Sequence, residues 1–545
     1  MNRPIRLLFF LIVAATALGL LALMVAVLAP GGVLGGWAVL KLLVLLAFAG
    51  VVPWLGICVG NALFGFAVLL FARDPPRAVL PVAGDISIAP IATPVAIAVT
   101  IRNEPMELVL PPLLALLDAL RGHGAFTGFI LSDTQDPALA AAEAAAVPPG
   151  LRYRRRSHNT GFKAGNVMDF LDQHADAFPL TVMLDADSVM TAPAVLRLVR
   201  IMQADPRMGI VQHLTVGKPA AAAFPRLFQF GMRAGMRVWA TGQALWQGAD
   251  GPYWGHNAIL RSAAFRDHCK LAPLPDGSTI LSHDQVEAAM LRAAGYKVCV
   301  WAGEDGSLEA NPPALPEFLH RDSRWLAGNL QYRHLLVQPG WTAMGRWQLV
   351  QAILLFAGAP LYTAILILAA VLAAGGGTAA SGPLLALGLA WPLALYAPKL
   401  LGYAEILLSA RQARRYGGRG MFLLGALAEI GFTLLLDALA TPHKTLAMLR
   451  LAFGAKPGWL PQNRSDRGVS WLEAARMFWP HTLLGLGVFS GFAAGSWTAV
   501  AWAAPFAIGL PLAIPFCVLT ASPAFSRGLQ RLGVAATPEE RACED

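Results

Sequence analysis

The stretch LTVMLDADSVM, residues Leu180–Met190, passes from an apolar run into two aspartates separated by one alanine. A strand directs alternate side chains to opposite faces, so Asp185 and Asp187 are expected to project together at a strand end. Two adjacent carboxylates repel each other unless a cation lies between their oxygens. Hard oxygen ligands of this kind suit Mg²⁺ or Mn²⁺, especially when a substrate phosphate completes the coordination. The alternative is a strand-to-helix turn in which Asp187 and Ser188 act as capping residues.

The composition places this stretch in a membrane protein. Of the 545 residues, 56% are hydrophobic and only 14% are charged, and the long apolar blocks lie before residue 72 and after residue 348. This segregation predicts a multi-span α-helical membrane protein with an inserted soluble domain. The formal charge of +9 follows the ends of the apolar blocks, so it reflects membrane topology and no nucleic-acid partner is expected. The five cysteines show no paired spacing, which argues against a disulfide framework or a zinc site.

The charges that flank the apolar blocks predict six spans with both termini in the cytoplasm. The segment Met421–Phe453 contains Glu429 and Asp437 and leads into a basic loop from Lys444 to Arg476, so it is expected to lie in the interface or re-enter. The predicted division is a transmembrane hairpin over 1–77, a cytoplasmic domain over 78–345, a hairpin over 346–410, a basic interfacial segment over 411–477, a hairpin over 478–522 and a cytoplasmic tail over 523–545.

The soluble domain reads as a mainly parallel α/β sheet. Apolar runs at 94–101, 128–131, 180–184 and 208–213 predict strands, and 111–120 predicts a helix between the first two. In such sheets ligands bind at the carboxyl ends of the strands, which is where Asn103-Glu104, Asp133 and Asp185 fall.

Three further clusters in this domain each allow two interpretations. The run 154–166 contains arginines, Lys163, glycines and Asn166, which suit a pyrophosphate or a lipid-facing surface. Asp284 opens a predicted helix, where it can act as a general base or as a helix cap. The segment 320–325, with Arg321, Arg324 and Trp325, suits a diphosphate clamp with a sugar-stacking face or a helix docked on the membrane.

Taken together, these clusters resemble a known family of enzymes. The series Ser132-Asp133, Lys163 to Asn166, Asp185 to Asp187, His283-Asp284 and Arg324-Trp325 resembles the processive family 2 glycosyltransferases, which include cellulose, chitin and hyaluronan synthases. Two features depart from the pattern of the cellulose-type synthases: Ser282-His283-Asp284 stands where they have Thr-Glu-Asp, and Arg321 stands where they have Gln. Both features resemble the glucans biosynthesis glucosyltransferase H family. The segments Tyr253 to Ile259 and Asp466 to Trp471 carry the same resemblance.

This resemblance implies a cytoplasmic domain of the GT-A type in a bacterial inner-membrane enzyme. The implied reaction is inverting transfer of glucose from UDP-glucose to a growing β-glucan of the osmoregulated periplasmic type, which then crosses the lipid bilayer. Periplasmic glucan-processing proteins are possible partners, and Mg²⁺ or Mn²⁺ is the implied cofactor. The implied site residues are Asn103, Glu104, Asp133, Lys163, Asn166 and Asp185 for the nucleotide sugar, Asp185 and Asp187 for the metal, Asp284 as base, Arg321, Arg324 and Trp325 for catalysis and the acceptor end, and His256 and Asn257 beside the acceptor.

Other readings stay open from the residues alone. A different processive synthase, making a cellulose-like or aminosugar polymer, would share most of these motifs. A transporter that senses a nucleotide sugar without turnover would also have a soluble domain between membrane helices. The acidic residues Glu405, Glu429 and Asp437 within apolar stretches can line a glucan path or form hydrogen bonds between helices.

Overall fold

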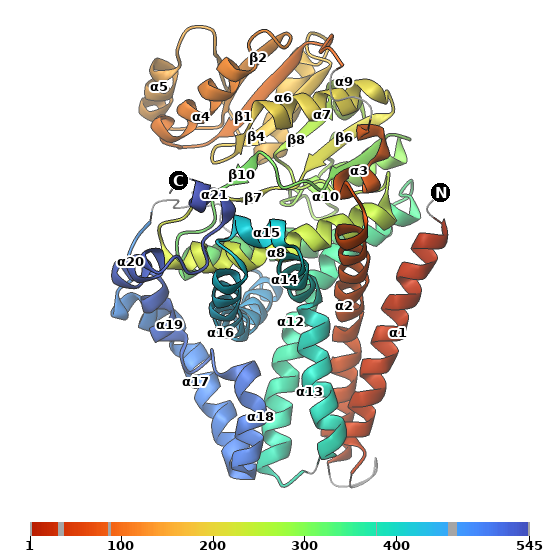
Figure 1. Ribbon diagram of the computed structural model, residues 1–545, viewed down its shortest axis with the longest axis vertical. Helices are drawn as coiled ribbons and strands as arrows, with labels where there is room; N and C mark the ends of the chain where they lie inside the picture. The colour runs from red at the N-terminus through yellow and green to blue at the C-terminus, as the bar shows by residue number, and fades with distance from the viewer. Residues whose placement is uncertain (1–2, 31–36, 85–88, 378, 456–465, 543–545) are drawn as a thin grey trace.

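The computed structural model describes residues 3–30, 37–84, 89–377, 379–455 and 466–542. Figure 1 shows an α/β domain at one end of the molecule and a bundle of long helices at the other. The predicted class, a helical bundle interrupted by an inserted α/β domain, is confirmed. Part of the basic loop expected after Met421–Phe453, residues 456–465, lies outside the described residues.

The main sheet runs in the order β3-β2-β1-β4-β8-β6-β9, and among these seven described strands only β8 is antiparallel to its neighbours. A three-stranded sheet, β5-β10-β7, lies beside it. The main strands are β1 (Val95–Ile101), β2 (Phe126–Ser132), β3 (Arg152–Arg155), β4 (Leu180–Asp185), β6 (Met208–His213), β8 (Ala258–Arg261) and β9 (Lys297–Trp301), and the short ones are β5 (Val189–Met190), β7 (Val216–Gly217) and β10 (Ser307–Glu309).

The parallel pairing of β1 with its two neighbours brings the predicted polar strand ends to one edge. Thr100 of β1 lies opposite Asp185 of β4, and Ile101 lies opposite Ser132 of β2. The segments that follow these strands therefore leave the sheet side by side, because carboxyl ends of parallel strands meet at the same edge.

Helices cover both faces of the sheet because alternate residues of β1 point to opposite sides. Ile97 packs in a core with Val109 of α4 and Val195 of α7, whereas Ala98 packs in a second core with Phe170 of α6. The helices of the domain are α4 (Met106–Ala119), α5 (Pro137–Ala146), α6 (Phe162–His174), α7 (Ala192–Ala204), α8 (Ala223–Gln247), α9 (Ser262–His268), α10 (Asp284–Ala293) and α11 (Leu315–Gln331), with the short elements α3 (Pro75–Val79), η1 (Pro81–Ala83) and η2 (Tyr332–His334) at its borders.

The structure corrects two local predictions in this domain, the start of a predicted helix and the strand position of Asp187. The helix expected over 111–120 begins at Met106, and Pro111 and Pro112 lie inside it, where each removes one backbone hydrogen bond. Strand β4 ends at Asp185, so Asp187 lies in the turn that follows and not on the strand. Strand alternation is therefore not what brings the two carboxylates together.

Four described helices are long and apolar enough to cross a membrane: α1 (Arg3–Leu28), α2 (Ala38–Phe71), α12 (Ala343–Ala374) and α16 (Arg419–Ala452). The pair α13 (Ser381–Leu395) and α14 (Ala397–Leu408) can form one more span, bent by 75° at its break. The remaining described helices are α15 (Ala410–Arg415), α17 (Trp471–Gly495), α18 (Trp497–Ala507), α19 (Ala513–Thr520), α20 (Pro523–Arg531) and α21 (Pro538–Ala542). The six-span topology stays a prediction.

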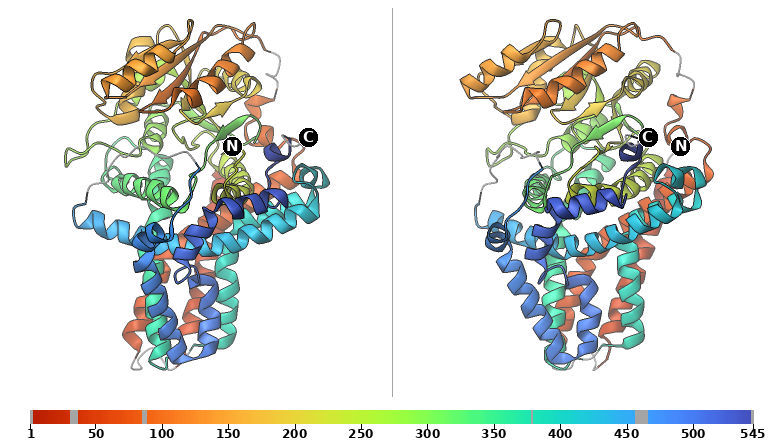
Figure 2. Two further views of the ribbon diagram at one scale, coloured as in Figure 1. Left: turned by 90° about the vertical axis from the view of Figure 1, so that its left-hand side faces the viewer. Right: turned by 60° about the vertical axis from the view of Figure 1, so that its left-hand side comes forward.

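The orientation of α16 separates it from the other long helices. In Figure 2 it lies across the domain-facing end of the bundle, and in Figure 1 it is seen nearly end-on. Length and composition would allow α16 to span a membrane, but the helix runs across the direction of α1, α2 and α12. This direction is the one that an interfacial segment would take.

The C-terminal helices form a hairpin that is shorter than expected. Helices α17 and α18 pack together and turn at Ser496, at the end of the bundle away from the α/β domain (Figure 1). Helix α18 has only 11 residues, and a helix needs about 20 residues to cross the hydrocarbon core of a bilayer. A second complete span over 478–522 is therefore not formed by α18 alone.

Helix α8 belongs to the α/β domain by sequence but packs on the bundle. A side chain at Gly65 of α2 would overlap the carbonyl of Val238, and one at Gly242 of α8 would overlap the carbonyl of Asn61. The two helices therefore cross at backbone contact. Trp246 of α8 adds a hydrogen bond from its indole nitrogen to the Asn61 side chain, 2.9 Å long.

The acidic residues in the apolar stretches form hydrogen bonds and ion pairs with neighbouring helices. Glu429 accepts from Lys399 at 2.5 Å, Asp437 accepts from Tyr396 at 2.8 Å, and Glu405 pairs with Arg237 of α8 at 3.1 Å. Of the two interpretations of these residues, the structure shows interhelical hydrogen bonding.

Candidate active site

A cavity of about 490 Å³ lies at the carboxyl ends of β1, β2 and β4. All five clusters that carried the resemblance to family 2 glycosyltransferases contribute residues to the wall of this cavity. The predicted site residues that line it are Glu104, Asp133, Lys163, Asn166, Asp185, Asp187, His256, Asp284, Arg321, Arg324 and Trp325.

Asp133 follows β2 and is held by Arg156, the residue directly after β3. The Nε and one terminal nitrogen of Arg156 each donate to a different Asp133 oxygen, both at 2.7 Å. The side chains are 6% and 10% exposed, so this is a buried, bidentate ion pair. A carboxylate offers about four lone-pair positions, so a further donor can still approach Asp133. Of the two interpretations of the arginine run, a lipid-facing surface does not describe Arg156.

Asn166 is buried on α6 and fixes that helix to the end of β2. Its side-chain nitrogen donates to the carbonyl of Leu131 at 3.0 Å, and its oxygen accepts from Arg154 at 2.6 Å. Both polar atoms of the amide are thus used within the protein, so Asn166 shapes the cavity wall more than it offers free hydrogen-bonding groups.

Lys163 and Asp185 form an ion pair at the centre of the cavity. Gly161, with φ of +74°, is the N-cap residue of α6, and two residues later the Lys163 ammonium reaches an Asp185 oxygen. The same Asp185 oxygen also accepts a hydrogen bond from the Thr100 hydroxyl, at 3.3 Å. Asp187 enters the same cavity from the turn after β4.

The donor set fits a divalent cation that is completed by substrate. Two carboxylates are hard oxygen ligands, and Mg²⁺ and Mn²⁺ bind readily to one or two carboxylates together with phosphate oxygens. No group of three or more His, Cys, Asp or Glu side chains suited to a metal occurs in the described part of the chain. Such an ion would therefore need oxygens from a bound diphosphate.

Asp284 is the first residue of α10 and faces the cavity. The N-cap position belongs to His283, whose side chain caps no backbone N–H, so Asp284 is not the helix cap. Its carboxylate accepts from the Ser282 hydroxyl at 3.1 Å. Because Asp284 begins α10 and its carboxylate faces the cavity, this carboxylate can accept the proton of a hydroxyl group bound there.

His283 lines the cavity beside Asp284 and pairs with a buried glutamate one turn along α10. Its Nδ1 lies 2.8 Å from a carboxylate oxygen of Glu287, and the Glu287 side chain is 2% exposed. Burial lowers the pKa of His283, but the carboxylates of Glu287 and Asp284 outweigh that effect, so its pKa is raised above 6.5.

Gly255 lies where these groups converge. Its φ of +84° favours glycine, and a side-chain carbon there would lie 3.6 Å from Asp284 Cβ and 3.8 Å from Lys163 Nζ. Residues 254–256 of the segment 253–259, which carried part of the family resemblance, thus line the cavity.

Helix α11 also contributes side chains to the wall of the cavity. Gly328 packs so tightly on Ser282 that a side-chain carbon would lie 2.7 Å from the serine Cβ, which fixes α11 against the start of α10. Arg321 stacks on the Trp325 ring one turn away, at 4.6 Å, and both line the cavity together with Arg324. Because these side chains face the cavity, membrane docking does not explain this segment.

His256 and Glu309 form a second histidine–carboxylate pair, with 3.2 Å between Nε2 and the carboxylate. Glu309 lines the cavity from β10 but was not predicted, because a three-residue strand after an irregular loop carries no sequence signal.

Two predicted site residues do not line the cavity. Asn257 has a φ of +48° and a fully buried side chain that donates to Ser307 at 2.9 Å, so it fixes the backbone next to His256. Asn103 has a φ of +56°, and its backbone N–H donates to Thr134 at 2.7 Å. Both asparagines take a left-handed backbone conformation that this residue type tolerates better than most.

Sequence comparison identifies relatives over nearly the whole chain. Residues 180–398 match the family described as glycosyl transferase family group 2. A glucans biosynthesis glucosyltransferase H of Rhodopseudomonas palustris is 33% identical over 541 residues, which cover 93% of this chain and 74% of the relative. Proteins of the same name from a Shewanella species and from Vibrio cholerae are 33% and 32% identical over the same shares of each chain.

Solved structures are more distant. The mannosyltransferase PcManGT from Pyrobaculum calidifontis, determined in complex with GDP-mannose and Mn²⁺, is 16% identical with a TM-score of 0.39, over 65% of this chain and 99% of the other.

Proposed function

Since the chain belongs to the glucans biosynthesis glucosyltransferase H family, we propose that it polymerises glucose from UDP-glucose into the β-glucan backbone of osmoregulated periplasmic glucans. The observation that carries this proposal is that five separate sequence clusters, from Asp133 to Trp325, line one cavity. Their side chains supply carboxylates for a metal, a candidate base and cations for a leaving diphosphate.

In the proposed reaction Asp284 takes the proton of an acceptor hydroxyl. The acceptor oxygen then bonds to the anomeric carbon of the donor while the bond from that carbon to UDP breaks, which inverts the anomeric centre. UDP leaves as an anion, and Lys163, Arg321 and Arg324 are the cations placed to stabilise it. A direct displacement needs no covalent enzyme intermediate.

The donor end of the cavity is proposed to lie at Asp133 and Asn166, with the uridine near the Asp133–Arg156 pair. The acceptor end is proposed to lie at Trp325 and His256. Asp185 and Asp187 would hold Mg²⁺ or Mn²⁺ against the diphosphate, and a bound cation supplies charge neutralisation to the departing phosphates.

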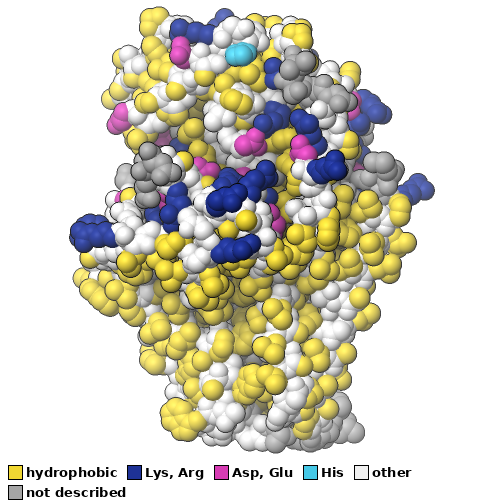
Figure 3. All heavy atoms as spheres, viewed as in Figure 1, with side chains coloured by type: hydrophobic (Ala, Val, Ile, Leu, Met, Phe, Trp, Pro, Cys, Tyr) yellow, Lys and Arg dark blue, Asp and Glu magenta, His cyan; other side chains and the backbone are white. Residues whose placement is uncertain are grey.

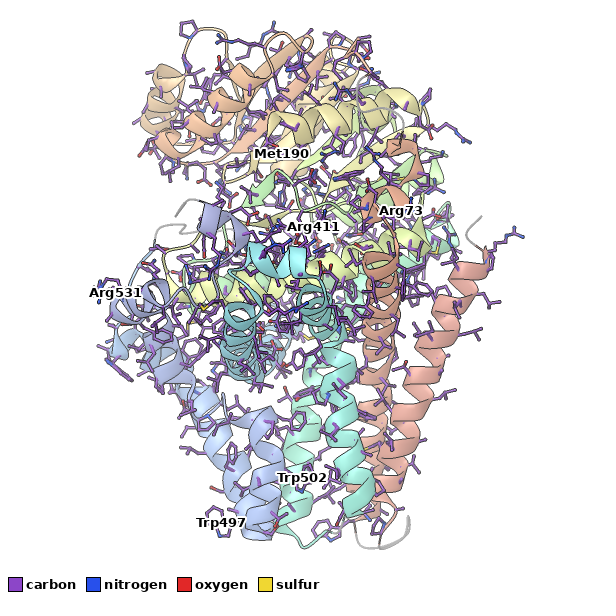
Figure 4. The ribbon with its side chains drawn as sticks, viewed as in Figure 1. Arg73, Met190, Arg411, Trp497, Trp502 and Arg531 are labelled. Carbon is purple, nitrogen blue, oxygen red and sulfur yellow. The ribbon has the colours of Figure 1, made fainter. Side chains whose placement is uncertain are left out.

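The proposed location is a bacterial inner membrane with the α/β domain in the cytoplasm. In Figure 4, Arg73, Arg411 and Arg531 lie where the domain meets the bundle, whereas Trp497 and Trp502 lie toward the far end. In Figure 3, the Lys and Arg side chains on this face gather at and above that boundary, and the bundle below it is mostly apolar. Cations on the domain side follow the positive-inside rule, which supports this orientation. Translocation of the glucan and contact with periplasmic glucan-processing proteins belong to the same proposal.

The experiment that tests this function uses the purified full chain in lipid vesicles with UDP-glucose and Mg²⁺. UDP release and glucan formation are expected from the unchanged protein and are expected to be lost in Asp284→Asn, with UDP binding retained. Asp267→Asn on the exposed end of α9 is the matched control, because it removes a carboxylate charge outside the cavity and should keep full activity.

Two results would contradict the proposal. Binding of UDP-glucose without turnover under any divalent cation would favour a nucleotide-sugar sensor or transporter. Turnover of another nucleotide sugar in preference to UDP-glucose would favour a different processive synthase.

A further inference from the structure

Glu143 is a buried carboxylate behind the donor end of the cavity. It lies on α5, it is 3% exposed, and no ion pair recorded for the described residues involves it. Three hydroxyl groups donate to it instead: Ser132 at 2.7 Å, Thr134 at 2.5 Å and Tyr153 at 3.0 Å. A buried carboxylate with three donors is well satisfied, and it fixes the direction of each hydroxyl hydrogen.

Two of these hydroxyls flank Asp133. Ser132 precedes it at the end of β2 and Thr134 follows it, so the Glu143 carboxylate holds the backbone on both sides of the proposed uridine-binding residue. The Thr134 N–H also donates to the Ser132 hydroxyl at 3.1 Å, which closes this turn on itself.

Thr134 also connects this turn to the neighbouring strand end. Its hydroxyl oxygen accepts the backbone N–H of Asn103 at 2.7 Å, and Glu104, the next residue, lines the cavity. Because the Thr134 hydrogen is committed to Glu143, the oxygen lone pairs point to Asn103. The Thr134 hydroxyl thus joins the loops after β1 and β2, beside the backbone hydrogen bond from Asp133 N–H to the Ile101 carbonyl at 3.0 Å.

Tyr153 differs from the other two donors. Its hydroxyl reaches Glu143 from β3, and it also contacts the Ser132 side chain and, at 3.4 Å, the carbonyl of Ala140 in α5. Neither Tyr153 nor Ala140 lines the cavity. The same carboxylate therefore has two bonds to the residues that flank the cavity-lining Asp133 and one to a residue of β3.

We propose that Glu143 is a positioning residue for the donor nucleotide, acting through Ser132 and Thr134 on the two loops that bind UDP-glucose. This inference rests on the proposed function. Glu143 sets the affinity of the site for the nucleotide and does not act on the reacting atoms, because no part of it reaches the cavity.

The test compares Thr134→Val with Tyr153→Phe in the full chain in vesicles. Each removes one hydroxyl donated to the same carboxylate, so both should lower the thermal midpoint by a similar amount. Thr134→Val is expected to raise both the KM for UDP-glucose and the Kd for UDP by about tenfold, with kcat changed less than twofold, which is the effect of one lost hydrogen bond. Tyr153→Phe is expected to leave both constants unchanged.

Two further variants sharpen the result. Thr134→Ser keeps the hydroxyl and is expected to restore the KM. Glu143→Gln, which keeps the shape but loses one acceptor oxygen, is expected to raise the KM without lowering kcat. Equal KM values for Thr134→Val and Tyr153→Phe, or a fall in kcat at constant KM, would overturn the inference. Failure of the proposed function would appear earlier, as no turnover of UDP-glucose by the unchanged protein.

Discussion

Lys163 on α6 donates a hydrogen bond from its ammonium group to the carboxylate of Asp185 at the end of β4. The carboxylate expected to bind a divalent cation is therefore paired with a resident cation. An ammonium group and a metal ion compete for the same oxygen, and a bound diphosphate can accept the ammonium when the metal takes its place.

Removing this competitor should increase the affinity for metal alone. Lys163→Met is expected to bind Mn²⁺ more tightly than the unchanged protein in the absence of nucleotide, and to show a higher KM for UDP-glucose because a phosphate partner is lost. Electron paramagnetic resonance of free Mn²⁺ measures the first effect. Lys297→Met, which breaks an ion pair with Asp205 outside the cavity, is the control. Weaker Mn²⁺ binding by Lys163→Met would contradict this competition.

A methyl group at Gly255 should abolish turnover with only a modest loss of stability. Gly255→Ala places a carbon beside Asp284 and Lys163 and forces alanine into a positive φ, which costs about 1–2 kcal/mol. Gly277→Ala imposes the same strain, since its φ is +76°, but meets no atom within 4 Å. Both variants should lose similar thermal stability, and only Gly255→Ala should lose glucan synthesis. Equal activities would show that the 253–259 segment does not border the reacting groups.

The His283–Glu287 pair predicts a stability difference that depends on pH. Because the pKa of His283 is raised in the folded protein, its charged form stabilises the fold fully below pH 6.5, and this contribution is lost as the pH rises through the raised value. The thermal midpoint of His283→Gln should therefore fall further below that of the unchanged protein at pH 6 than at pH 8.5. His268→Gln, which replaces an exposed histidine of α9, is the control for the loss of a histidine as such. A larger deficit at the higher pH would contradict the assignment.

Glu304, which follows β9, joins the sheet of the α/β domain to helices α8 and α15. It pairs with Arg233 of α8, which is 1% exposed, and with Arg415 of α15. Burial raises the pKa of Glu304, but Arg233, Arg237 and Arg415 together lower it to about 2.

Replacing Glu304 leaves a buried guanidinium short of its partner. Glu304→Gln is expected to cost about 3 kcal/mol of stability, the lower end for breaking a buried ion pair. Glu539→Gln removes the other carboxylate on Arg233, but its side chain is 27% exposed and water can replace it, so the loss should be smaller. Chemical unfolding in detergent compares the two variants, and equal losses would contradict this ranking.

Site residues could be placed most accurately from the sequence where a short apolar strand runs directly into polar residues. Asp133 and Asp185 follow β2 and β4, whose apolar residues and parallel pairing put their ends at one edge, and Asp284 begins a helix as expected. These positions depend on local pattern and on one general rule of parallel sheets, so they could be placed without the structure.

Residues positioned by long-range packing could not be placed in this way. Glu309 reaches the cavity from a short strand, and Glu143 acts from within a helix whose pattern is only apolar and small. The family resemblance implied that Asn257 lies beside the acceptor, yet its side chain is buried and donates to Ser307. For α16, by contrast, the charges within and after Met421–Phe453 predicted a course other than a single crossing, whereas length and hydropathy alone would allow a membrane span.

The backbone contact between α2 and α8 has a consequence for dissecting this protein. Residues 78–345 look like a soluble insert in sequence, but α8 lies within them and presents Phe224, Phe230 and Trp246, all at most 1% exposed, to helices outside that range. A fragment cut at these boundaries would carry one half of an interface without its other half. The catalytic part and the membrane part are thus one unit of folding, and the shortest fragment that keeps this interface intact must retain the helices on which α8 rests.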